Sequence, residues 1–216
     1  MNYSSLRHTS IFECCAKAEI ESIENAIGLP VKRYKKDEII LHAGECVENI
    51  CIVLSGSVRI DSNDIRGNRS ILKIVKRGEV FAEAYACIPD VPLMVDAVAN
   101  EPCEIVFLNV AKLFSLPESE TKNKLLKNLV AISSKKNLHL SARILHTASK
   151  TIRGRVLSYL SQEATKQNSR FITIPFNRQQ MADYLSVERS ALSKELGKMK
   201  ADGLIDYHKS TFKLTL

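Results

Sequence analysis

Between residues 31 and 109, short apolar runs alternate with polar turn residues. The runs are too short to form independent helices and are rich in Ile and Val, which favours β-strands. Four glycines recur here at intervals of 12, 11 and 11 residues, typical of strand plus turn in a small antiparallel roll or barrel. Glycine also supplies the positive φ that tight turns need. The glycines are Gly44, Gly56, Gly67 and Gly78, and the expected strands cover 38–41, 50–54, 58–60, 70–75, 95–98 and 104–108.

Two segments of the front region depart from this strand pattern. Residues 14–28, ahead of the first strand, are expected to be helical. Within the roll, Phe81–Cys87 breaks the alternation and predicts one short helix that carries a lone acid, Glu83, among small residues.

A long helix is predicted to begin at Pro117 and Glu118, since proline suits the first helical turn and an acid there suits the helix dipole. No Gly or Pro follows until Gly154. Within this helix, residues spaced alternately four and three positions apart, from 126 to 147, form a partly apolar heptad seam with Asn137 near its centre. A buried Asn facing its own copy can fix the register of a parallel dimer; the alternative is an amphipathic helix packed on its own domain. The predicted dimer interface contains Leu126, Val130, Asn137, Leu140 and Ile144.

The last third of the chain predicts two short helices around a tight turn, followed by a β-hairpin. Asn177 and Gln180 form a capping-box-like pair before the first of these helices. Gly203 is a stop signal after the second. The expected helices are 152–166, 178–185 and 188–201, and the expected strands are 171–174, 204–207 and 212–216.

This order of elements is the plan of a winged helix-turn-helix, whose second helix enters the major groove of DNA. The solvent face of the predicted helix 188–201 carries side chains whose chemistry suits base-edge and phosphate contacts. The alternative is the solvated helix of a protein–protein module. The residues on that face are Arg189, Ser190, Ser193, Lys194 and Lys198.

Charge distinguishes the two ends of the chain and favours DNA as the partner of the C-terminal end. Residues 1–147 hold 19 Lys and Arg against 18 Asp and Glu, a net charge of +1. Residues 148–216 hold 12 against 6, a net charge of +6, so nearly all of the overall +7 lies in the last third. A basic module at one end indicates an anionic partner there.

The composition, with 45% hydrophobic and 25% charged residues, is that of a globular protein. The longest uncharged stretch has ten residues, too few to cross a bilayer, and the N-terminus lacks an apolar signal core. We therefore expect a cytoplasmic protein with no membrane contact. The six cysteines are expected to be reduced there.

Four segments together resemble the bacterial Crp/Fnr family of transcription regulators, and the resemblance covers essentially the whole chain. It implies an α+β fold: an antiparallel jelly-roll-like β-roll of the cyclic-nucleotide-binding kind that senses an effector (1–116), a dimerisation helix (117–147) and a winged helix-turn-helix that binds DNA (148–216). It implies a homodimer on palindromic promoter DNA, with RNA polymerase as a partner if the protein is an activator. The segments are LHAGE at 41–45, LSGSV at 54–58, KRGEVF at 76–81 and NRQQMADYLSVERSALSKEL at 177–196.

The resemblance also implies roles for residues of the helix pair. Arg189, Ser190 and Lys194 fall where family members contact base edges, and Ser193 matches a serine of the oxygen-sensing branch. Many relatives have Arg where this chain has Lys194, and lysine lacks the planar fork that matches guanine. In the preceding helix, phosphate contacts are implied for Arg178 and Gln179.

The expected effector pocket departs from the cyclic-AMP-binding branch of the family. That branch uses a glycine, a glutamate and, about ten residues on, an Arg-Ser pair that holds the cyclic phosphate. Here Ala82 replaces the glycine, and Leu93 and Met94 stand where Arg-Ser is expected. A phosphate buried there would lack its charge partner, so an effector other than cyclic AMP is expected. The predicted pocket contains Glu83, Tyr85, Leu93 and Met94.

The sequence identifies neither the effector nor a cofactor. The adjacent pair Cys14 and Cys15, with no CxxC motif, disfavours an iron–sulfur cluster. The histidines show no ligand spacing, although a haem-based gas sensor stays open as an alternative, as does a ligand-binding adaptor without DNA contact. An enzyme on the β-roll is disfavoured because His42 is the one histidine in the roll and no His/Glu ligand set accompanies it.

Overall fold

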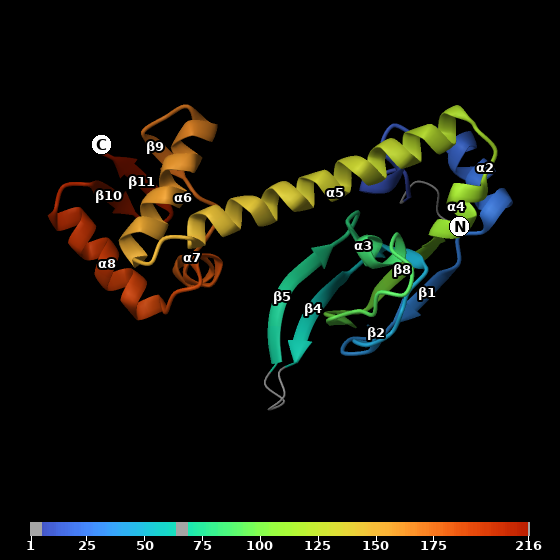
Figure 1. The fold of residues 1–216 in the computed structure, drawn as a ribbon, viewed down its shortest axis with the longest axis horizontal. Helices are drawn as coiled ribbons and strands as arrows, with labels where there is room; N and C mark the ends of the chain where they lie inside the picture. Colours follow the sequence, from blue (N-terminus) through green and yellow to red (C-terminus); the bar gives the residue numbers. More distant parts are fainter. Residues whose placement is uncertain (1–5, 64–68, 216) are drawn as a thin grey trace. The chain divides into compact units, whose positions relative to one another are not determined.

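The computed structural model describes residues 6–63 and 69–215. The chain divides into two compact units between Ser134 and Lys135, a point inside helix α5 (Glu120–Thr147). Figure 1 shows the order of the elements along the chain. The first unit contains a 3₁₀ turn η1 (Ser10–Phe12), helices α2 (Lys17–Ile27), α3 (Glu83–Ala86) and α4 (Val110–Ser115), and strands β1 (Val31–Tyr34), β2 (Ile39–Leu41), β3 (Asn49–Ser55), β4 (Ser57–Asn63), β5 (Arg69–Lys76), β6 (Val80–Phe81), β7 (Asp96–Ala99) and β8 (Cys103–Asn109).

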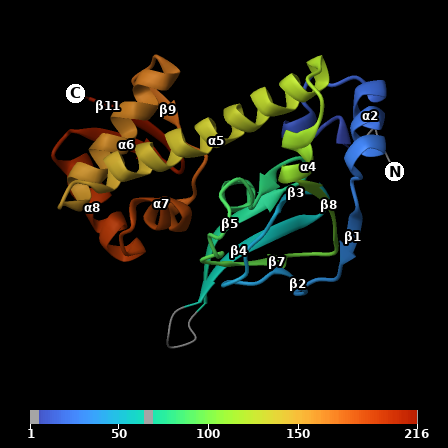
Figure 2. The same ribbon diagram turned by 45° about the vertical axis from the view of Figure 1, so that its right-hand side comes forward.

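Two four-stranded sheets form the β-roll of the first unit, and Figure 2 shows them from a second side. Their strand orders are β1-β8-β3-β6 and β2-β7-β4-β5, with antiparallel pairing throughout. One apolar cluster contains Cys51 and Val53 from the first sheet with Val58 and Ala99 from the second, so the sheets pack face to face. The predicted antiparallel roll is confirmed.

Strand β3 is buried on both faces, which explains the long uncharged run of the sequence. Its alternate residues Ile50 and Ile52 face a second apolar cluster, built with η1, α2, α4 and the start of α5. Cys51 and Val53 face the space between the sheets. A strand covered on both sides loses the polar alternation of a half-exposed strand.

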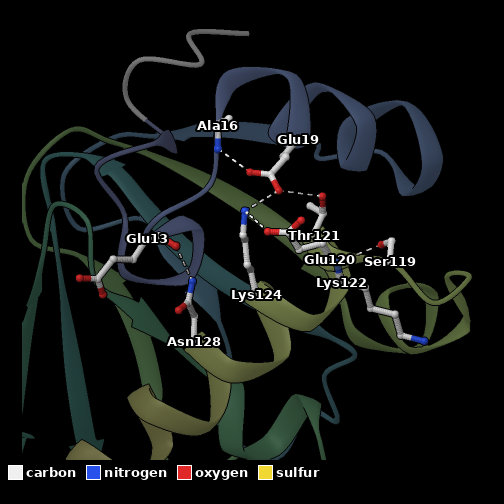
Figure 3. A network of polar contacts seen from close by, with 9 residues as sticks. All are labelled: Glu13, Ala16, Glu19, Ser119, Glu120, Thr121, Lys122, Lys124 and Asn128. Carbon is white, nitrogen blue, oxygen red and sulfur yellow. Dashed lines mark hydrogen bonds and ion pairs between the residues drawn. The ribbon is translucent and has the colours of Figure 1, made fainter.

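Polar contacts fasten the N-terminal segment to the first turns of α5 (Figure 3). Glu19 accepts hydrogen bonds from the backbone N–H of Ala16 at 2.7 Å and from Lys124 Nζ at 2.8 Å. Asn128 Nδ2 donates to the carbonyl oxygens of Ile11 and Glu13, at 3.0 and 2.8 Å. This half of α5 is therefore part of the first unit's core, and Leu125 and Leu129 are buried in it.

Glycines occupy the turns of the roll as expected. Gly44, Gly56 and Gly78 have φ of 89°, 73° and 84°, the left-handed region that suits glycine. At Gly56 a Cβ would also collide with the carbonyl oxygen of Pro102. The fourth member of the series, Gly67, lies outside the described residues.

The second unit is a three-helix module with a small sheet. It contains α6 (Ile152–Gln167), α7 (Arg178–Leu185), α8 (Arg189–Ala201), and strands β9 (Phe171–Thr173), β10 (Ile205–His208) and β11 (Thr211–Leu214) in the order β10-β11-β9. The capping box at Asn177 and Gln180 is present, with both reciprocal hydrogen bonds at 2.9 Å. One core buries Leu160, Leu192 and Phe212.

Small differences from the expected boundaries have local causes. Helix α5 begins at Glu120, so Pro117 and Glu118 precede it. Helix α4 was not expected; it buries Val110 and Leu113 and is capped by Asn109, which accepts from Lys112 N. Among the described helices, none combines the length and the hydropathy that a membrane span requires.

Candidate functional site

The turn between α7 and α8 is held from outside by Arg155 on α6. Ser186 ends α7 in the left-handed conformation, with φ of 53°. Arg155 Nη1 donates to the carbonyl oxygens of Leu185 and Ser186, at 3.0 and 2.9 Å, and its Nε donates to Ser149 O at 2.9 Å. Sequence reasoning missed this residue, because nothing local links position 155 to a turn 30 residues further on.

A second arginine of α6 fixes helix α8. Arg153 Nε donates to Glu195 Oε1, and its Nη2 lies against Asp202 Oδ2, both at 2.7 Å. Leu192, Leu196 and Met199 are buried on this inner side of α8. The opposite side is therefore presented to solvent in a defined orientation.

The five predicted contact residues of α8 are all exposed, and among the described residues no ion pair engages the three cationic ones. An exposed cationic side of a helix that follows a tight turn can present donors to an anionic groove. The residues are Arg189, Ser190, Ser193, Lys194 and Lys198.

Glu188, a residue that sequence reasoning placed inside this helix, is its N-cap. The carboxylate accepts from the backbone N–H of Ser190 and of Ala191, each at 2.8 Å, and from the Ser190 hydroxyl. These hydrogen bonds, chiefly that from the Ser190 hydroxyl, lower the pKa of Glu188. The group is therefore a carboxylate at neutral pH.

The two residues of α7 for which phosphate contacts were predicted have partners inside the protein. The Arg178 guanidinium lies over the rings of Tyr207 and Phe212, with its Cζ 4.8 and 5.1 Å from the ring centroids. It is half-buried, and this burial lowers its pKa. Gln179 Nε2 donates to Asp183 Oδ1 at 2.8 Å. Their contact with phosphate stays a prediction.

The C-terminal end of α5 is locked to α7 inside the second unit. Arg143 donates to the carbonyl oxygens of Tyr184 and Asp183, at 3.2 and 3.1 Å. His146 is 2% exposed, and its Nδ1 lies 2.9 Å from the Tyr184 hydroxyl. His146 is therefore a hydrogen-bonded core residue of the second unit.

The four residues predicted for the effector pocket lie in different surroundings. Glu83 is buried at the start of α3 and raises the pKa of both Cys51 and Cys87, to which burial contributes more. Leu93 is 6% exposed, whereas its neighbour Met94 is 81% exposed. Tyr85 is half-buried on α3. The structure therefore does not bring Leu93 and Met94 together with Glu83 into one enclosed cavity, and their shared role stays a prediction.

The position before Glu83 has a backbone conformation that favours glycine. Ala82 has φ of 63°, in the left-handed region. Such a conformation costs a residue with a Cβ roughly 1–2 kcal/mol. In this chain alanine occupies this left-handed position.

Helix α5 carries an exposed apolar stripe. Asn137 and the small residue Ser133 are exposed on the same side. Leu126, the first residue of the predicted seam, packs partly against the core of the first unit. The exposed apolar residues are Val130 (66%), Leu138 (70%), Leu140 (63%), Ile144 (68%) and Leu145 (64%).

Comparison with known proteins gives two matching family models. The cyclic nucleotide-binding domain matches residues 31–120, and the Crp-like helix-turn-helix domain matches residues 154–215. Among curated proteins, the chain is 23% identical over 185 residues to the cAMP-activated global transcriptional regulator CRP of Pasteurella multocida, covering 84% of this chain and 88% of the relative.

Solved structures share the fold at low identity. CprK in complex with OCPA has a TM-score of 0.67 at 15% identity, with 91% of this chain and 92% of that one covered. The c-di-GMP responsive global regulator CLP of Xanthomonas campestris has a TM-score of 0.58 at 20% identity, with 92% and 99% covered.

Proposed function

Because the chain belongs to the Crp/Fnr family of DNA-binding transcription regulators, which are not enzymes, we propose that it binds palindromic promoter DNA as a homodimer under the control of an effector other than cyclic AMP. If it activates transcription, RNA polymerase is a further partner. Its place of action is the cytoplasm, where the promoter DNA is.

One observation carries the proposal of sequence-specific DNA binding. Helix α8 is fixed from behind by Arg153 and presents five exposed polar residues on its other side. Arg189 can donate two parallel hydrogen bonds to guanine O6 and N7, and Lys194 can donate to the same atoms as a point charge. Lys198, further along the helix, can neutralise a phosphate.

The test separates base reading from phosphate attraction by comparing two variants. Arg189→Ala is expected to weaken binding to the selected site by roughly 1–3 kcal/mol and binding to random DNA much less. Lys198→Ala is expected to weaken both about equally and to lower the salt dependence by about one unit. Fluorescence anisotropy at fixed salt measures both affinities. Equal weakening by Arg189→Ala would exclude base reading by this residue, and a wild-type protein without sequence preference, with and without host extract, would refute the proposal.

The homodimer is supported by the exposed stripe of α5. Val130, Leu140 and Ile144 are each about two-thirds exposed in the single chain, which is costly for three large apolar residues on one side of a helix. The heptad repeat aligns the same side with itself in a second, parallel copy, and Asn137 can then pair with its equivalent. Two copies place two recognition helices against half-sites about one helical turn apart.

The choice of effector is supported by the residues that replace the phosphate-binding pair. The Pasteurella relative is described as cAMP-activated. Here Leu93 and Met94 provide no cation and no hydroxyl for a cyclic phosphate. An anionic phosphate in contact with apolar side chains loses its hydration without compensation.

A further inference from the structure

Two exposed serine hydroxyls of α8 donate hydrogen bonds to acceptors within the protein. The Ser190 hydroxyl donates to the carboxylate of Glu188. The Ser193 hydroxyl donates to the carbonyl oxygen of Arg189, at 3.0 Å. A serine hydroxyl has a single proton and two lone pairs. Each of these side chains therefore faces solvent as a hydrogen-bond acceptor.

Glu188 itself is occupied by these protein contacts. Its Oε1 accepts from Ser190 N, and its Oε2 accepts from Ala191 N and from the Ser190 hydroxyl. A carboxylate offers about four lone-pair sites, so most of its accepting capacity is used in capping the helix. Its effect on a ligand of α8 is exerted through Ser190.

We propose that Glu188 is a positioning residue that holds Ser190 as a hydrogen-bond acceptor, so that the base facing Ser190 is selected for an exocyclic amino group, cytosine N4 or adenine N6. The proposal rests on DNA binding through α8. In the major groove only these two bases carry an amino donor, whereas guanine O6 and N7 and thymine O4 are acceptors. If Ser190 faced an acceptor on a base, neither group would supply a proton, and no hydrogen bond would form.

By the same argument, the neighbouring cations select bases that present acceptors. Arg189 and Lys194 are donors without accepting capacity, and they match the acceptors of guanine. The adjacent pairs Arg189–Ser190 and Ser193–Lys194 thus each combine one donor with one acceptor. A hydroxyl that was free to rotate would tolerate any base, and the contact with Glu188 removes that freedom.

The experiment is a selection from random DNA, followed by affinity measurements with all four base pairs at the position facing Ser190. That position is identified as the one whose base preference is lost in Ser190→Ala. Glu188→Ser retains a short oxygen that can cap α8 but removes the carboxylate that takes the Ser190 proton. The wild type is expected to prefer cytosine or adenine there by about fivefold, the worth of one neutral hydrogen bond. In Glu188→Ser this preference is expected to disappear while the preferences facing Arg189 and Lys194 persist.

Asp206→Ser is the matched control, because it removes one exposed carboxylate from the same unit, on β10 rather than α8. It is expected to change overall affinity and to leave every base preference unchanged. Ser190→Thr keeps the hydroxyl and is expected to keep the preference, which covers the case in which Glu188→Ser does not fold. Guanine or thymine opposite Ser190, or an unchanged preference in Glu188→Ser, would overturn the inference while leaving DNA binding intact. A wild type that selects no sequence would refute DNA reading itself, and the inference with it.

Discussion

Replacing Leu140 and Ile144 of α5 by lysine is expected to convert the proposed dimer to monomers and to abolish specific DNA binding. The two side chains are 63% and 68% exposed in the single chain. Complete burial of a side chain of this kind contributes about 1.5–3 kcal/mol, so burial of the exposed two-thirds contributes roughly 1–2 kcal/mol. Both positions occur in each copy, which gives roughly 4–8 kcal/mol for four side chains. Even the lower figure corresponds to a roughly thousandfold weaker dimer, before the repulsion among four new charges.

Sedimentation equilibrium of the full chain measures this directly, since the monomer has a mass of 24.2 kDa. His139→Lys is the matched control: His139 is exposed on the same helix, about half a turn away from the stripe. It adds a charge without touching the predicted seam and is expected to leave the dimer intact. A double variant that sediments like the wild type, or a wild type that is itself monomeric, would refute the assignment of this stripe to a second copy.

Two further predictions concern the effector and the second unit. Cyclic AMP is expected to bind no better than about millimolar, because Leu93 and Met94 offer its phosphate no partner; micromolar binding by calorimetry would contradict this. Burial, and next the nearby Lys166, lower the pKa of His146, while Gln162 and Glu163 oppose the shift. Folding therefore favours the neutral form of the His146 imidazole. The stability that this histidine contributes is complete above its unfolded pKa of about 6.5. It is lost as pH falls below that value, by at most about 1.4 kcal/mol per pH unit. Urea denaturation at pH 7.5 and 5.5 should show a smaller loss in His146→Gln than in wild type, and an equal loss would exclude this histidine as the cause.

Local patterns were sufficient to predict most of the roll and the helix pair. The strands alternate or form short apolar runs, and the capping box at Asn177 marks the start of α7 within one residue. Helix α8 begins at Arg189, one residue later than predicted, and glutamate is not a preferred N-cap. Glu188 acts as one here through the length of its side chain, which reaches the N–H groups of Ser190 and Ala191.

Contacts between residues far apart in the chain could not be predicted in this way. In the sequence Arg155 cannot be distinguished from an ordinary surface cation. Only the packing of α6 brings it to the carbonyl groups of Leu185 and Ser186. The surroundings of the predicted effector-pocket residues could not be predicted for a related reason. Leu93 and Met94 are neighbours in sequence, yet one is buried and the other is exposed, a division that residue type does not determine.

Arg178 combines a role inside the protein with the phosphate contact expected from its position in the family. Its guanidinium lies over the rings of Tyr207 and Phe212 and holds the β10–β11 hairpin against α7. Phosphate recognition uses the N–H edge of the same group. Within the described residues, that edge meets the weak acceptor Met181 Sδ, at 4.0 Å from Nη1. A phosphate oxygen is a far stronger acceptor for a half-buried cation, so we expect the N–H groups of Arg178 to be the part that DNA engages. The residue that orients the wing is thereby the same one that can fix α7 on the DNA backbone.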